Sequence, residues 1–240
     1  MAVSRKLLCC LFLLCCGAAR AGDSVTLYYN ERPPYLIGAP DGTVSGLTAS
    51  VAAQAFKAAG IDAHWQRMPY NRQVESLREG GARCMVGTFK TPERERHARF
   101  SKPIYRDLPT IGLMRGGVAS GGRLSLQRVL ATPDLRVLVK ENYSYGRDID
   151  AALARIHGGV VVTTAENVNM LAMLYGQRAD LMFIGEEEFQ YLMRQSTYAE
   201  KDFSLLRFAD LPKGEARHIM CSMDVPEAWM RRLDREIHFE

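Results

Sequence analysis

The sequence predicts an α/β protein made of two successive units, each with strands and helices in alternation. Hydrophobic stretches of strand length alternate with segments of helical periodicity between residues 24 and 88, and again between residues 136 and 184. Because strands that alternate with helices form mainly parallel sheets covered by helices, we expect two such sheets.

The elements of the first unit follow from local signals. Residues 24–29 read as a strand, and the paired prolines at 33 and 34 force the following residues into a loop, because proline suits neither a helix interior nor a ladder. Residues 47–59 carry an apolar face at helical spacing and stop at Gly60. The unit is completed by a strand at 63–68, a helix at 71–79 and a strand at 84–88.

The second unit repeats this order. Its expected strands are 136–141, 160–163 and 181–184, and its expected helices are 148–156 and 166–175. Between the units lie an extended segment at 101–108 and a strand at 110–115. After them come a strand at 217–222 and an amphipathic helix at 226–237. The strand at 217–222 is one more than a closed second unit needs.

Residues 1–21 predict a secretory signal peptide. Arg5 and Lys6 precede an apolar run of about ten residues, about half the length that a membrane-spanning helix needs. Small residues at Ala19 and Ala21 suit signal peptidase. A lipoprotein signal is the alternative, because Cys15 and Cys16 end the run, although a lipid-bearing Cys normally follows a small residue. We expect a mature chain that begins at Gly22 in the periplasm.

Net charge and cysteine content exclude one class of function and indicate a disulfide. Residues 1–21 hold three basic residues and no acid, so their removal lowers the formal charge from +4 to +1 and removes any argument for nucleic-acid binding. Cys84 and Cys221 are the cysteines left after cleavage. In an oxidising compartment the two thiols suggest one disulfide, and two buried free thiols are the alternative.

Residues 87–105, GTFKTPERERHARFSKPIY, join a strand to the start of a helix and to a proline-bearing extended exit. Thr91 suits an N-cap, Pro92 suits the first helical position, and Glu93 suits the positive end of the helix dipole. The segment resembles the ligand-binding segment of periplasmic solute-binding proteins of the polar amino-acid type, the family 3 extracellular solute-binding proteins of ABC transporters. The resemblance implies that Arg94 holds a solute carboxylate and that Thr91 belongs to the same ligand site; a well-capped surface helix is the alternative.

The resemblance covers essentially all of residues 24–240, and its other marks are Pro33, Pro34, Tyr35, Gly42, Gly46, the segment 100–105, Gly176 and Asp180. It implies a two-lobed periplasmic-binding-protein fold of type II, with two crossover strands as the hinge. Lobe I is expected at 22–106 plus 215–240, and lobe II at 107–214. It also implies that the strands of Cys84 and Cys221 lie side by side, joined by a disulfide.

Solutes are expected in the crevice between the lobes, where strand ends and loops meet. Tyr35 resembles the aromatic on which a solute stacks, with a packing role as the alternative. Residues 142–146, which include Tyr143 and Ser144, resemble a polar turn that presents N–H groups to an anion; Ser144 as a simple N-cap is the alternative.

Two departures from the family pattern argue against an ordinary α-amino acid as ligand. Phe89, next to Thr88, stands where a Ser or Thr commonly contacts the carboxylate, which indicates a remodelled pocket. Gly185 stands where an acid is expected to hold a solute ammonium. Glu186 could replace that acid, but residues 186–188 also read as surface glutamates that compensate the helix dipole. Similarly, Arg72 reads as a second cleft cation or, more simply, as part of a solvated face.

Signatures of catalysis and of metal sites are missing from the sequence: we found no nucleophile turn, no phosphate-binding glycine pattern and no metal-ligand spacing among the five histidines. We therefore expect no enzyme, cofactor or metal, but a monomeric receptor that delivers a small polar solute, amino-acid-like or a carboxylate, to a membrane permease. The alternatives are a periplasmic lyase or dehydratase using Glu31 or Glu186, and a stand-alone sensory receptor.

Overall fold

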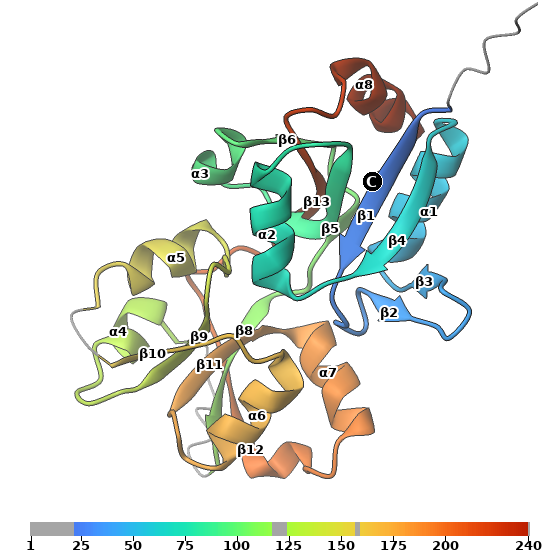
Figure 1. Cartoon of the computed structure of the whole chain (residues 1–240). Coiled ribbons are helices and arrows are strands. Elements are labelled where there is room, and N and C mark those ends of the chain that lie inside the picture. Colours follow the sequence, from blue (N-terminus) through green and yellow to red (C-terminus); the bar gives the residue numbers. More distant parts are fainter. Residues whose placement is uncertain (1–21, 117–123, 157–158, 240) are drawn as a thin grey trace, which may run out of the picture.

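The computed structural model describes residues 22–116, 124–156 and 159–239, so the expected signal peptide lies outside the described residues. The chain forms two lobes, each built on its own sheet (Figure 1). Within the described ranges, no helix has both the length and the apolar character needed to cross a membrane. The two-lobed α/β fold expected from the sequence is confirmed.

The first lobe contains a six-stranded sheet in the order β4-β1-β5-β13-β6, with β7 also paired to β13. Its strands are β1 (Ser24–Tyr29), β4 (Asp62–Arg67), β5 (Arg83–Phe89), β6 (Ala98–Phe100), β7 (Tyr105–Arg106) and β13 (Ala216–Ser222). Strand β1 pairs in parallel with β4 and β5, whereas β13 is antiparallel to β5, β6 and β7. The surplus strand near the C-terminus therefore returns to the first lobe, as the resemblance implied.

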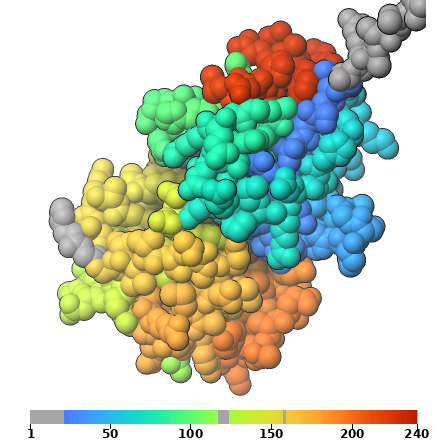
Figure 2. Space-filling view, viewed as in Figure 1, coloured from blue at the N-terminus to red at the C-terminus, as the bar shows by residue number. Residues whose placement is uncertain are grey.

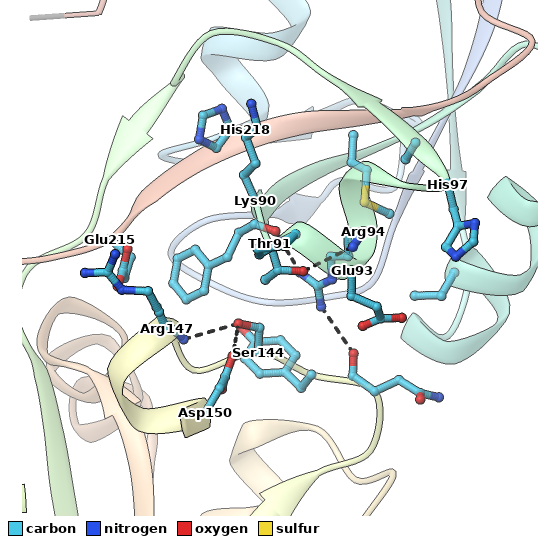
Figure 3. A pocket seen from close by; sticks show the side chains of 18 of the residues that line it. Lys90, Thr91, Glu93, Arg94, His97, Ser144, Arg147, Asp150, Glu215 and His218 are labelled. Atoms are coloured by element: carbon cyan, nitrogen blue, oxygen red, sulfur yellow. Dashed lines mark hydrogen bonds between the residues drawn. The ribbon is translucent and has the colours of Figure 1, made fainter. Parts of the chain in front are cut away.

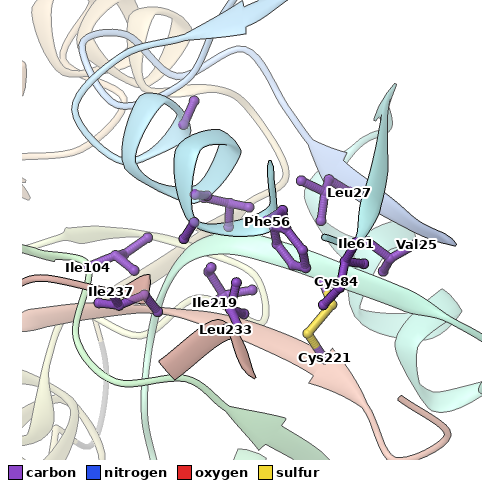
Figure 4. Packing of buried hydrophobic residues seen from close by; sticks show 14 of the residues in the cluster. Val25, Leu27, Phe56, Ile61, Cys84, Ile104, Ile219, Cys221, Leu233 and Ile237 are labelled. Atoms are coloured by element: carbon purple, nitrogen blue, oxygen red, sulfur yellow. A yellow bond between two sulfur atoms is a disulfide. The ribbon is translucent and has the colours of Figure 1, made fainter. Parts of the chain in front are cut away.

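Helices cover both faces of this sheet. They are α1 (Ala49–Ala58), α2 (Tyr70–Arg78), α3 (Pro92–Glu95) and α8 (Glu227–Glu236); a small hairpin of β2 (Ile37–Gly38) and β3 (Val44–Ser45) precedes α1. Leu27 packs with Phe56 and Leu233 on the face covered by α1 and α8 (Figure 4). The next residue, Tyr28, packs with α2 on the other face, because successive side chains of a strand point to opposite sides.

A disulfide joins the two central strands of the first lobe. Cys84 on β5 and Cys221 on β13 are register partners, and a bond between their sulfur atoms lies inside the core of that lobe (Figure 4). The pairing is confirmed, and the alternative of two free thiols is wrong.

The second lobe contains a five-stranded sheet in the order β10-β9-β11-β8-β12. Its strands are β8 (Thr110–Arg115), β9 (Val137–Lys140), β10 (Val160–Thr163), β11 (Leu181–Gly185) and β12 (Phe203–Arg207). Its helices are α4 (Leu126–Leu130), α5 (Arg147–Leu153), α6 (Asn167–Tyr175), α7 (Glu186–Gln195) and the 3₁₀ helix η1 (Glu200–Asp202). Strands β9, β10 and β11 are parallel, while β8 is antiparallel to β11 and β12.

The chain crosses between the two sheets twice, between β7 and β8 and between β12 and β13. The expected lobe boundaries, 106/107 and 214/215, fall in these connections; that they delimit units which move about a hinge remains a prediction. In the space-filling view the two lobes touch over the face shown (Figure 2).

Candidate functional site

A cavity of about 670 Å³ lies between the lobes, on the side where α3 faces α5 (Figures 1 and 3). Figure 3 shows Lys90, Thr91 and Arg94 of the first lobe opposite Ser144 and Asp150 of the second. This volume is within the range of small-molecule sites in proteins. The remaining charged and imidazole side chains on its wall are Arg78, Glu93, His97, Arg147, Glu215 and His218.

The start of α3 forms one wall of the cavity. Thr91 is the N-cap, because its Oγ1 accepts a hydrogen bond of 3.3 Å from the backbone N–H of Arg94, and Pro92 follows as expected. The half-buried Arg94 guanidinium donates from Nη1 to the Phe89 carbonyl at 2.9 Å and from Nη2 to the Tyr70 hydroxyl at 2.7 Å. Nη2 also donates to the Asn142 carbonyl of the second lobe at 3.2 Å. Arg94 therefore lies on the cavity wall and links the two lobes.

The polar turn at 142–146 forms the opposite wall. The Ser144 hydroxyl donates to Oδ2 of Asp150 at 2.5 Å, and the Tyr145 N–H donates to Oδ1 of the same carboxylate at 2.8 Å. Gly146, not Ser144, is the N-cap of α5, so the simple N-cap interpretation of Ser144 is wrong. Asp150 accepts a hydrogen bond from the Tyr145 N–H, and Ser144 accepts one from the Gly146 N–H. These two backbone N–H groups already have partners within the turn.

The centre of the cleft is filled by a chain of alternating rings and guanidinium groups. The Arg217 guanidinium lies 4.5 Å from the Phe89 ring centroid and 4.2 Å from that of Tyr35. The Arg32 guanidinium lies 4.9 Å from the Tyr35 centroid and 5.0 Å from that of Tyr143. Such contacts are favourable, most of all where water is excluded.

The predicted site residues come together around this filled centre. A void of only about 20 Å³ is lined there by six of them: Tyr35, Thr88, Phe89, Arg94, Tyr143 and Ser144. The Thr88 hydroxyl donates to the His218 carbonyl at 3.5 Å, and Tyr35 is fully buried. Thr91 lies on the larger cavity beside Arg94. Tyr35 therefore serves as packing between two arginines in this structure, in line with the alternative stated for it.

Glu188, rather than Glu186, faces the cleft. Its Oε1 and Oε2 accept hydrogen bonds of 3.1 and 2.8 Å from Nε and Nη2 of Arg32, across the two lobes. Burial by itself lowers the pKa of Arg32, but the effect of the Glu188 carboxylate and of Tyr143 is larger. The pKa of Arg32 is therefore raised, and the guanidinium stays positively charged.

The expected roles of residues 186–188 need correction. Glu187 and Glu188 are 8% and 1% exposed, so they are not surface residues that merely compensate the dipole. Glu186 pairs with Arg207 instead of entering the cleft. A helical signal was available in the sequence, because Glu188 lies four residues before the buried Leu192 and so shares its face.

A second buried ion pair lies where the chain crosses between the lobes. Nε and Nη2 of Arg217 donate to Oδ1 and Oδ2 of Asp107 at 2.5 and 2.6 Å, and Nη1 donates to the Gly87 carbonyl at 2.7 Å. Both side chains are 3% exposed. No sequence pattern indicated this pair, since its members are 110 residues apart.

The structure explains both departures from the family pattern. A Cβ at Gly185 would lie 2.8 Å from the Tyr35 hydroxyl oxygen, so the ring of Tyr35 leaves no room there for the expected acid. Phe89 supports the guanidinium of Arg217 where a hydroxyl was expected.

The remaining candidate residues lie away from the cavity. Arg72 is 65% exposed and pairs with Glu75, which confirms a solvated face. Glu31 accepts hydrogen bonds from the Gly38 N–H, and Glu186 contacts Arg207. Neither of these two carboxylates lines the interlobe cavity, so the geometry does not favour the enzyme alternative that relied on them.

Several solved structures with the same fold are structures of binding proteins. An ancestral arginine-binding protein bound to arginine matches with a TM-score of 0.71 and 14% identity over 89% of this chain and 90% of that one. EhuB in complex with hydroxyectoine matches with a TM-score of 0.69 and 21% identity over 89% and 81%. AbpA from Streptococcus pneumoniae, an amino acid ABC transporter substrate-binding protein bound to L-arginine, gives 0.67 and 16% over 90% and 87%. At these identities the likeness shows the fold alone.

No curated protein sequence matches this chain. A family model does match, over residues 25–183, which span β1 through most of β11 and include both walls of the interlobe cavity. The model describes bacterial extracellular solute-binding proteins, family 3. Since the match extends over more than half of the chain, the protein belongs to the bacterial extracellular solute-binding proteins of family 3.

Proposed function

We propose that this protein is a periplasmic receptor that captures a small polar solute with an anionic group, amino-acid-like or a simple carboxylate, and presents it to a membrane permease. The observation that carries the proposal is the cavity of about 670 Å³ between the lobes, with Arg94 on its wall. The fold neighbours bound to arginine and to hydroxyectoine add support, because both of these solutes contain a carboxylate.

The charges on the cavity wall favour an anion. Arg78, Lys90, Arg94 and Arg147 outnumber the acids Glu93, Asp150 and Glu215. Arg78 and Glu93 pair with each other, Lys90 pairs with Glu95 and Arg147 lies beside Asp148, so among the described residues Arg94 is the basic side chain of this wall without an acidic partner. The Asp150 carboxylate already accepts hydrogen bonds from Ser144 and Tyr145. Burial also raises the pKa of Asp150 and of Glu215, which makes a negative charge less favourable on these two acids than in water.

Arg94 is the proposed anchor of the solute anion. A guanidinium has five N–H donors, and three hydrogen bonds to Phe89, Tyr70 and Asn142 hold this one in position. The donors that remain can meet a carboxylate oxygen with little loss of side-chain freedom. A solute anion that binds Arg94 and also contacts the second-lobe wall would favour the closed arrangement, and function is then a population shift about the proposed hinge without chemical change.

Mass spectrometry of the small molecule released from denatured, freshly purified protein would identify the solute; if none is released, a thermal-shift panel of carboxylic and amino acids replaces it. Calorimetry with that solute should then show at least about tenfold weaker binding for Arg94→Ala, and an intermediate value for Arg94→Lys, because charge-assisted hydrogen bonds contribute about 1.5–3 kcal/mol each. Small-angle scattering should show a smaller radius of gyration with solute.

Two control variants separate anion binding from other effects. Arg96→Ala removes an exposed guanidinium of the same short helix and should leave affinity unchanged. Asn71→Ala removes an interlobe hydrogen bond to Glu141 of 2.6 Å outside the cavity, so it reports the cost of a weaker lobe contact alone. Unchanged affinity for Arg94→Ala, or a loss no larger than that of Asn71→Ala, would refute the anchor. A chemically altered solute would indicate an enzyme instead.

A further inference from the structure

The guanidinium of Arg32 lies in a closed set of complementary groups. Tyr35 of the first lobe and Tyr143 of the second contact it through their rings, at 4.9 and 5.0 Å from the ring centroids. The Glu188 carboxylate accepts two hydrogen bonds from Nε and Nη2 of Arg32, and Asn167 donates to Oε1 of Glu188 at 2.7 Å. Tyr143 and Glu188, which contact Arg32, and Asn167, which contacts Glu188, belong to the second lobe.

These partners require a cation. The Glu188 side chain is 2% exposed, and its described partners are Arg32 and the Asn167 amide. A carboxylate buried in this way is strongly unfavourable without an opposite charge. The forked geometry matches a planar guanidinium better than an ammonium, and the two rings favour a flat cation as well.

Arg32 reaches this place from a turn that is itself well fixed. The Arg32 N–H donates to the Leu36 carbonyl at 2.9 Å, and its carbonyl accepts from the N–H groups of Tyr35 and Leu36 at 2.9 and 3.0 Å. The guanidinium is therefore tethered beside its partners, at a high effective concentration relative to any cation in solution.

We infer that Glu188, Asn167, Tyr35 and Tyr143 form a guanidinium-binding subsite in the cleft, and that the chain's own Arg32 fills it in place of the cationic group of a solute. The inference deepens the proposed function and rests on it for the identity of the cleft. It gives a reason for selectivity: the solute held at Arg94 needs an anionic group and no cationic one, because the place for a cation is already taken. It also means that Arg32, rather than the solute, supplies one bridge between the lobes.

The test is chemical rescue of Arg32→Ala by ethylguanidinium, with ethylammonium at equal concentration as the comparison. Removal of Arg32 leaves the buried Glu188 carboxylate without a cation, so ethylguanidinium should bind and raise the melting temperature saturably, by about 3–6 °C at ten times its Kd. Wild-type protein, in which the subsite is filled, should show no such rise. Arg72→Ala, which removes an exposed guanidinium, should behave like wild type.

The double variant Arg32→Ala/Glu188→Gln identifies the partner, because it removes the charge that demands a cation and should abolish the rescue. A folded Arg32→Ala protein that ignores ethylguanidinium, or an equal rise in wild type, would overturn the inference. If Arg32→Ala is recovered unfolded, refolding is followed by circular dichroism: recovery only with ethylguanidinium supports the subsite, and equal results with and without it overturn it. Ethylguanidinium has no anionic group, so failure here leaves the Arg94 proposal standing.

Discussion

Removal of one partner of the Arg217–Asp107 pair should strongly destabilise the fold where the chain crosses between the lobes. Asp107→Asn keeps the size of the side chain and removes its charge. The Arg217 guanidinium, 3% exposed, would then keep its hydrogen bond to the Gly87 carbonyl and its contacts with the rings of Tyr35 and Phe89. In place of the Asp107 carboxylate it would face a neutral amide. Loss of one partner from a buried ion pair costs about 3–5 kcal/mol, because the other charge stays buried without compensation.

For a chain of this length, each kcal/mol corresponds to about 2–4 °C, so the melting temperature should fall by roughly 6–20 °C. Urea unfolding followed by circular dichroism measures the free energy directly. Glu75→Gln breaks the exposed pair with Arg72, whose N–O distance is 2.9 Å, and serves as the control; its loss should stay below about 1 kcal/mol.

A second comparison separates the ion pair from simple packing. Asp107→Leu/Arg217→Met removes both charges, leaves no unpaired ion and should recover a large part of the loss. The reasoning is wrong if Asp107→Asn unfolds within about 1 kcal/mol of wild type, or no more easily than Glu75→Gln.

Two further predictions concern the first lobe. Because Cys84 and Cys221 are bonded, denatured, unreduced protein should show no free sulfhydryl. The bond closes a sequence separation of 137 residues, so Cys84→Ser/Cys221→Ser should lose up to about 5 kcal/mol of unfolding free energy. A titratable thiol or an unchanged urea midpoint would contradict this. Burial lowers the pKa of His218 below 6.5, so the unfolded chain takes up a proton first and stability is lost as the pH falls through 6.5 toward the folded value. His218→Asn should therefore reduce the drop in melting temperature between about pH 7.5 and 5.5, whereas the exposed His238→Asn should not, and equal drops in all three proteins would count against the assignment.

The local elements of this protein follow from short stretches of its sequence. Strand β1 has the predicted bounds, Thr91 caps α3 through its own hydroxyl, and the order of strands and helices implied the two sheets. Capping and periodicity depend on side chains within a few residues, so a single sequence contains them. The resemblance added the return of β13 and, with it, the pairing of Cys84 with Cys221.

Short elements that depend on a distant partner were missed. Strand β12 pairs with β8 at the edge of the second sheet, where the Leu124 N–H also donates to its Arg207 carbonyl, and the β2–β3 hairpin has two-residue strands. Helix α4 has five residues, too few for a clear helical period. Their conformation is fixed by what they pack against rather than by a strong local pattern.

Which groups meet in the cleft depends on contacts between distant parts of the chain. Arg32 and Glu188 are 156 residues apart, Arg217 and Asp107 are 110 apart, and no local signal marks any of the four as a partner of another. The burial of these charges depends on how the two lobes face each other, and that arrangement depends on packing along the whole chain. For this reason the resemblance could suggest Arg94 as the anchor for an anion, which remains a prediction, whereas the inferred cation subsite rests on contacts that only the folded protein brings together.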